Sequence, residues 1–159
     1  NLAPAADIFS RTGFLEKAAY CLLGIGKKAD AEKLVIEGLE EQPDNYSLQC
    51  LLGDIKDEPS FYESAWISSN MTFISALKAL ASYHFKKDNW VKAESAYCDL
   101  VKILPAFETN WFYLGCCQMK LEHWELAKQS FTKAAGLNPE FYQAWNNLAA
   151  VCMELNDYD

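Results

Sequence analysis

Several kinds of residue are scarce in this chain, and each shortage excludes a class of structure or partner. The 159 residues include only 7 glycines and 5 prolines, too few for the frequent tight turns of a β-sandwich or barrel. Only one of the 14 cationic side chains is an arginine, Arg11, and the formal net charge is −8. Because polyanionic surfaces reward clustered cations, and arginine most of all, we expect no binding to nucleic acid or to a membrane surface.

Two further absences bear on location. The chain contains no apolar run of about 18 residues, the length that a membrane span needs, and no charged-then-apolar leader. It also begins without Met, so we expect an excised fragment of a longer protein. The 6 cysteines lack the regular spacing of a disulfide framework, which predicts reduced thiols. We expect a cytoplasmic location that extends to the nucleus.

What the chain has in abundance is alanine and leucine. The 20 Ala and 19 Leu far outnumber the 15 β-branched residues, and both residues lose little rotamer freedom in a helix. The composition therefore predicts an all-α fold.

The sequence also repeats itself. Pro105 and Pro139 lie 34 residues apart, and a frame of that length starting at Glu108 has large residues and small residues at fixed positions. Positions 4, 7, 8, 20, 24, 27 and 32 of that frame are Trp111, Leu114, Gly115, Ala127, Phe131, Ala134 and Pro139. Large side chains at 4, 7 and 24 would fill the space between paired helices, and small ones at 8, 20 and 27 would let the helices approach. Gln118, at the usually aromatic position 11, predicts one weakened packing site.

This pattern resembles the tetratricopeptide repeat, which implies a right-handed α-solenoid (superhelix) of antiparallel helix pairs. Neighbouring frames give one fragment, 1–159, with six units: 1–11 (partial), 12–45, 46–73, 74–107, 108–141 and 142–159 (first helix only). The unit 46–73 has 28 residues, six fewer than a full repeat, so its second helix must be truncated or bent. We expect helices near 5–11, 14–24, 28–41, 45–55, 60–68, 73–86, 90–103, 107–120, 124–136 and 140–155.

Within that superfamily, the short central unit is the most specific feature. It contains the run Leu51 to Asp54, then Tyr62 and the Ala65–Trp66 pair, and in these it resembles the tetratricopeptide repeat protein 27 family. The resemblance implies a eukaryotic, intracellular, non-enzymatic scaffold, co-chaperone-like, that assists the assembly or folding of other proteins. Where that family is expected to have several arginines after the Ala-Trp pair, this chain has none.

Residues for catalysis or metal binding are few. Of the two histidines, His84 occupies a packing position, which predicts a buried imidazole, and His123 lies in an inter-helix turn, which predicts exposure. Neighbouring residues of a helix point about 100° apart, so Cys116 and Cys117 cannot grip one ion together. We therefore expect no enzyme, no cofactor and no metal site.

Function should lie on the first helices of the units, which line the concave face of such a solenoid. We predict a groove for an extended or helical segment of a partner protein, with aromatic and thioether anchors and amides that hold the partner's backbone. The predicted groove residues are Lys78, Ser82, Thr109, Phe112, Tyr113, Cys116, Met119, Gln143, Asn146, Asn147 and Met153. The open alternative is that the apolar members pack against neighbouring repeats.

Partner classes can be narrowed further. A dicarboxylate clamp for a chaperone tail needs Lys, Asn, Asn, Lys and Arg in five slots, and four of those slots fail here. The five slots read Lys78, Ser82, Tyr113, Gln143 and Asn147. One lysine cannot neutralise two terminal carboxylates, which argues against a chaperone-tail partner. We also expect dimer or crystal contacts through the truncated last repeat, and a regulatory arm of a larger glycosyltransferase or phosphatase remains the alternative function.

Overall fold

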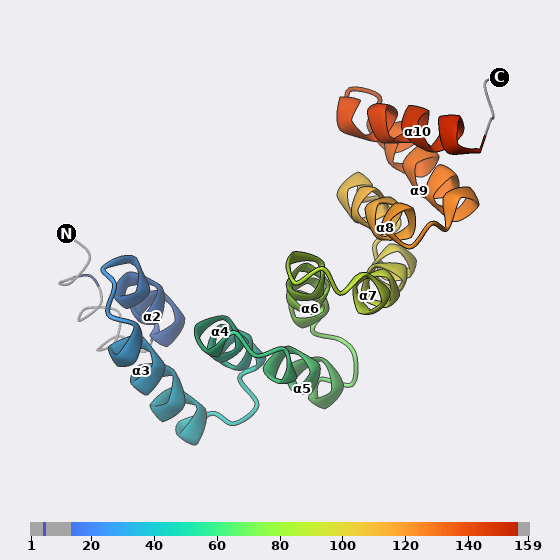
Figure 1. The fold of residues 1–159 in the computed structure, drawn as a ribbon. Helices are drawn as coiled ribbons and strands as arrows, with labels where there is room; N and C mark the ends of the chain where they lie inside the picture. The colour runs from blue at the N-terminus through green and yellow to red at the C-terminus, as the bar shows by residue number, and fades with distance from the viewer. Residues whose placement is uncertain (1–4, 6–13, 156–159) are drawn as a thin grey trace. The chain divides into compact units, whose positions relative to one another are not determined.

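A computed structural model describes residue 5 and residues 14–155. Contacts divide the chain into two compact units, residues 1–77 and 78–159, which are described one at a time (Figure 1). In the described residues all regular structure is helical, as the composition predicts. The helix predicted at 5–11 lies outside the described residues, apart from residue 5.

The first unit contains two helix pairs. Its helices are α2 (Leu15–Gly24), α3 (Lys28–Glu41), α4 (Tyr46–Lys56) and α5 (Ser60–Ser68). The buried side chains of α2, α3 and α4 form one apolar cluster around Val35, Leu48 and Leu51. The boundary between the units falls within the next helix, α6 (Ile74–Lys86).

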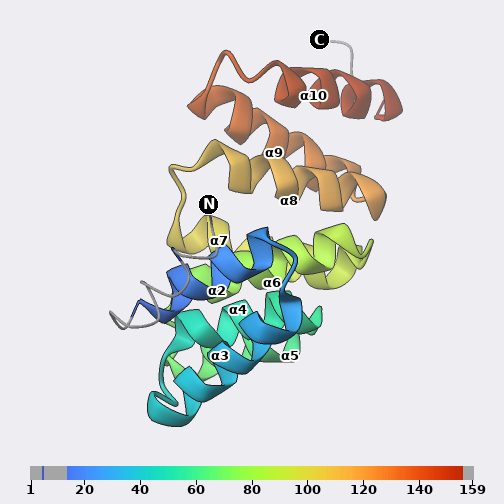
Figure 2. The ribbon, with the colours of Figure 1, turned by 90° about the vertical axis from the view of Figure 1, so that its left-hand side faces the viewer.

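The second unit continues with α7 (Trp90–Ile103), α8 (Glu108–Lys120), α9 (Trp124–Leu137) and α10 (Tyr142–Glu154). Figure 2 shows α8, α9 and α10 stacked in successive layers. All nine described helices lie within two residues of the bounds that the sequence predicts.

The short central repeat, residues 46–73, contains two shortened helices. Its helices α4 and α5 have 11 and 9 residues, whereas α6 and α7 have 13 and 14. After α5 the chain turns through Asn70 and Met71, whose φ angles are 52° and 60°. The Ser69 hydroxyl donates to the carbonyl of Trp66 at 2.8 Å and accepts from the amide of Phe73 at 3.1 Å. The predicted truncation of the second helix is therefore confirmed, and side-chain hydrogen bonds close the turn that follows the shortened α5.

The turns inside the full-length pairs share one conformation. Gly26, Asp88 and Glu122 occupy equivalent positions between the first and second helices, with φ angles of 78°, 56° and 60°. Asn89 caps the helix that follows, with its side chain accepting from the amide of Lys92 at 3.4 Å.

One side-chain hydrogen bond is found in several repeats. It joins the first turn of a repeat's first helix to the turn that precedes this helix. The indole N–H of Trp111 donates to the carbonyl of Pro105 at 2.9 Å, and that of Trp145 donates to Pro139 at 3.0 Å. In the short unit, Gln49 replaces the tryptophan, and its Nε2 donates to the Pro43 carbonyl at 2.7 Å. In these three repeats frame position 4 therefore supplies an N–H donor as well as bulk, whereas in the repeats 12–45 and 74–107 it is leucine, Leu15 and Leu77.

Packing between α8 and α9 follows the predicted size pattern, with one difference. Phe131 is fully buried and lies against Gly115. Gln118 is buried as well, and its Oε1 accepts a hydrogen bond of 2.6 Å from the Ser130 hydroxyl. The predicted weak packing site is therefore filled by a buried polar pair, since serine on α9 supplies the partner that an aromatic ring would not need.

Candidate functional site

A hollow of about 440 Å³ lies in the second unit, between the first helices α6 and α8 and over the second helix α7. Its volume is within the range of roughly 300–1,000 Å³ that is typical of ligand sites. Four of the predicted groove residues line it: Lys78, Ser82, Thr109 and Tyr113. The other lining residues are Phe85, Lys86, Tyr97, Leu100 and Asn110.

Three aromatic rings form one wall of this hollow. The rings of Tyr97 and Tyr113 are stacked, with centroids 5.5 Å apart and planes 19° apart. Phe85 meets Tyr113 edge-on at 5.1 Å and Tyr97 at 6.3 Å. Tyr113 remains 39% exposed while Tyr97 is buried. The cluster therefore holds the Tyr113 ring in place and leaves part of it open for contact, at low entropic cost to a ligand.

The remaining lining groups are rich in hydrogen-bond donors. Burial raises the pKa of the Tyr97 phenol; a phenol is protonated at neutral pH even at its ordinary pKa, so this group can donate a hydrogen bond. Asn110 is buried, and its Nδ2 has no hydrogen-bond partner among the described residues. The ammonium of Lys78 lies 5.5 Å from the centroid of the Phe107 ring, a cation–π contact that restrains it.

Asn110 is a residue that the sequence analysis missed. The equivalent position of two other repeats is alanine, Ala76 and Ala144, and both residues are fully buried. A polar side chain at a position that is otherwise alanine is the signal that could have found it. Tyr97 and Leu100 were missed for a different reason, because they come from a second helix.

The structure places other predicted groove residues against the core. Phe112, Cys116 and Met119 pack around Phe131 and Val151. The ring of Phe112 lies 5.9 Å from that of Phe131 and 4.8 Å from that of Phe141. Since these side chains already have apolar partners, they are less available to a ligand than Tyr113 is.

The predicted residues of α10 do not line the hollow. Asn147 donates from Nδ2 to the Cys116 sulfur at 3.7 Å, which joins α10 to α8. Gln143, Asn146 and Met153 are exposed, as are Tyr142 and Trp145 on the same helix. The structure thus brings together four of the eleven predicted residues in one hollow and gives most of the others to packing or to the surface of α10.

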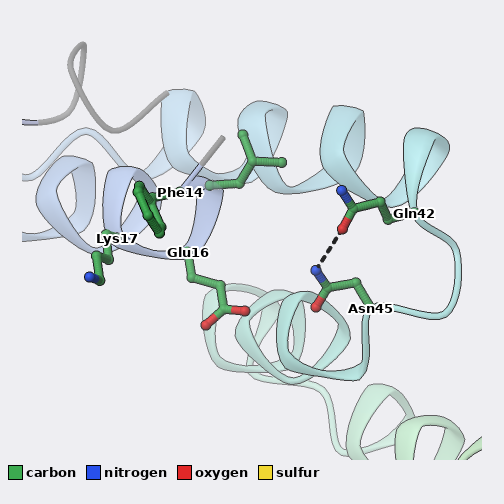
Figure 3. A pocket seen from close by; sticks show the side chains of 6 residues that line it. Phe14, Glu16, Lys17, Gln42 and Asn45 are labelled. Carbon is green, nitrogen blue, oxygen red and sulfur yellow. Dashed lines mark hydrogen bonds between the residues drawn. The ribbon is translucent and has the colours of Figure 1, made fainter. Parts of the chain in front are cut away.

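A second, smaller hollow of about 170 Å³ lies in the first unit. Figure 3 shows its lining, which includes Phe14, Glu16 and Lys17, with a hydrogen bond of 3.1 Å from Asn45 to Gln42 on the far side. Its volume is below the range of roughly 300–1,000 Å³ expected of ligand sites. We therefore take the hollow between α6 and α8 as the candidate site.

Groups suited to catalysis are not assembled in the described part of the chain. Among residues 5 and 14–155, no three His, Cys, Asp or Glu side chains gather to hold a metal ion. Burial raises the pKa of the Cys116 thiol to about 11 and that of Cys117 to about 12, which keeps both as weakly nucleophilic thiols. His84 is buried, as predicted, and exposed His123 lies 3.3 Å from the Glu94 carboxylate.

No helix in the described residues has both the length and the apolar character needed to cross a membrane.

Comparison with known proteins identifies the repeat type. No protein-family model matches the chain. A TPR repeat-containing protein of Schizosaccharomyces pombe is 30% identical over 97% of this chain, and a tetratricopeptide repeat protein 27 homolog of Dictyostelium discoideum is 34% identical over 76% of it. The chain spans 19% and 14% of the length of these two relatives.

A solved structure of the protein MamA superposes with a TM-score of 0.80 at 14% identity, covering 92% of this chain and 85% of that one. This likeness concerns the fold and confirms the predicted class, a solenoid-type array of antiparallel helix pairs. The named relatives confirm the predicted resemblance to tetratricopeptide repeat protein 27. From its repeat frame, its helix pairs and these relatives, the chain belongs to the tetratricopeptide repeat proteins.

Proposed function

We propose that this chain is a non-catalytic interaction scaffold that binds a segment of another protein in the hollow between α6 and α8. The observation that carries the proposal is the lining of that hollow, where a tyrosine ring that is 39% exposed lies beside two hydroxyl side chains, Ser82 and Thr109, and two lysines that form no ion pair in the described residues. A rigid aromatic anchor surrounded by hydrogen-bond donors suits a peptide, which offers both side chains and backbone carbonyls.

The scaffold would assist the assembly or folding of its partner by holding that segment. We also propose a cytoplasmic location that extends to the nucleus, and the 6 cysteines support it because all of them are free thiols. Contacts between copies through the exposed face of α10 are a further proposal, supported by the exposure of Tyr142 and Trp145.

Site-specific photo-crosslinking tests the binding site. A benzophenone amino acid replaces Thr109, an exposed residue of the hollow, and in a matched chain it replaces Lys133, an exposed residue of α9 outside the hollow. We expect a discrete crosslinked partner from position 109 alone, and its loss when Tyr113→Ala is added. Equal crosslinking from both positions, or crosslinking from 109 that survives Tyr113→Ala, would contradict the proposal.

A further inference from the structure

We propose that the hollow between α6 and α8 selects peptide segments that carry an aspartate or glutamate side chain next to an apolar one. This inference rests on the proposed function and names the chemistry of the partner. The carboxylate belongs to an internal residue of the segment, so a free carboxyl terminus is not required.

The charge of the lining is the first argument. The chain has 22 acidic and 14 basic residues, yet the charged side chains that line the hollow are two lysines, Lys78 and Lys86, with no aspartate or glutamate. No ion pair joins either lysine to a carboxylate in the described part of the chain. A local cationic site in an acidic protein favours an anionic ligand and disfavours a basic one.

The spacing of the two lysines matches an extended peptide. They lie eight residues apart on α6, which corresponds to about 12 Å along the helix axis. About four residues of an extended chain cover the same length. A segment lying along α6 can therefore place one acidic side chain near each lysine.

The uncharged groups of the lining point to the same ligand. The Tyr97 phenol, which is protonated at neutral pH, lines the hollow and can donate a hydrogen bond. Ser82 and Thr109 add hydroxyl groups that can donate. A segment rich in acceptors, such as carboxylates and backbone carbonyls, would satisfy these donors, whereas lysine or arginine side chains would not.

The aromatic wall accounts for the apolar neighbour. Tyr113 is 39% exposed and is backed by the stacked ring of Tyr97. A flat, supported ring of this kind gives an aliphatic or aromatic side chain a firm contact surface. The carboxylate and the apolar group would then occupy adjacent parts of one hollow.

Selection from a display library of random short peptides tests the inference. The immobilised 159-residue chain is used to enrich peptides, which are then synthesised with amidated carboxyl termini and titrated by fluorescence anisotropy. The test variant is Lys78→Gln with Lys86→Gln. The matched control is Lys92→Gln with Lys133→Gln, which removes the same charge from exposed positions that do not line the hollow.

We expect the unmodified chain to enrich peptides with Asp or Glu beside an apolar residue. The test variant should bind peptides with one acidic side chain about threefold more weakly, and peptides with two acidic side chains about four residues apart about tenfold more weakly, because one or two exposed ion pairs are lost. The control should bind as the unmodified chain does. Lys78→Glu with Lys86→Glu should shift the enrichment toward basic peptides.

Enrichment without an acidic preference, or equal weakening by test and control variants, would overturn the inference. If such peptides still lost binding with Tyr113→Ala, the proposed site would stand and only the acidic preference would fail. If no peptide were enriched, or binding were indifferent to Tyr113→Ala, the inference and the proposed function would fail together.

Discussion

Replacing Gly115 by alanine should destabilise the chain, because α8 crosses α9 at this residue without room for a methyl group. A Cβ atom there would lie 2.8, 2.9 and 2.9 Å from three atoms of the Phe131 ring. That ring is fully buried, so it cannot swing into solvent. Overpacking of this kind costs about 1–3 kcal/mol, and alanine recovers up to about 1 kcal/mol through its better helix propensity.

The expected net loss is about 0–2 kcal/mol in the free energy of unfolding, or a fall of up to about 8 °C in Tm. Urea unfolding followed by far-UV circular dichroism measures the first quantity, and a thermal scan measures the second. Gly136→Ala in the neighbouring helix is the matched control, since nothing lies within 4 Å of its added Cβ. This variant should gain about 0.5–1 kcal/mol.

A third variant isolates the contact itself. Phe131→Leu removes ring atoms that an alanine at 115 would strike, so the cost of Gly115→Ala should be smaller in that background. If Gly115→Ala were as stabilising as Gly136→Ala, or if its cost were unchanged beside Phe131→Leu, the small residue at this position would not serve close helix approach, and that reading of the repeat would be refuted.

Further outcomes concern buried polar groups and thiols. Asn110→Ala should raise the free energy of unfolding by about 1 kcal/mol, since it removes an unpaired buried N–H. A lower free energy of unfolding, measured with urea, would show that the Asn110 amide has a hydrogen-bond partner in the folded chain. Because burial raises the pKa of Cys116 to about 11 and of Cys117 to about 12, iodoacetamide at pH 8 should modify both far more slowly than in the unfolded chain, and equal rates by peptide mass spectrometry would contradict this. Folding likewise raises the pKa of Cys50 and Cys116 from 9.0 to about 11. The unfolded chain then releases these protons at lower pH than the folded chain, so Tm should fall as pH rises from 9 to 11. The fall of Tm with pH should be less steep in Cys116→Ala than in the unmodified chain. Equal slopes in the two chains would contradict the role given to Cys116.

The fold could be predicted from local signals because the repeat is itself a local code. Trp111 and Trp145 lie in the first turn of equivalent helices and form the same hydrogen bond to the proline carbonyl six residues earlier. Helices α2 to α9 each end within two residues of a proline, a glycine or a residue with positive φ, so the signals that end them are local. The shortened pair at 46–73 was predictable for the same reason, from the missing residues.

The site could be predicted only in part. Lys78 and Tyr113 occupy frame positions that face away from the paired helix, and the structure brings both to the hollow. Phe112 occupies a similar frame position but packs with Phe131 and Phe141, since its ring is long enough to reach the next helices. Whether Phe112 or Tyr113 stays exposed to a ligand depends on the side chains of neighbouring helices. The spacing of residues in the sequence does not determine this.

The most direct test of the central claim is to map where a selected peptide binds. The 15N-labelled chain is titrated with a peptide enriched by it, and changes in amide chemical shift are followed by NMR. The account predicts the largest changes at Ser82, Thr109 and Tyr113, with saturation at the affinity measured by anisotropy. Changes centred on α10 or on the hollow around Phe14, with those three residues unaffected, would contradict it.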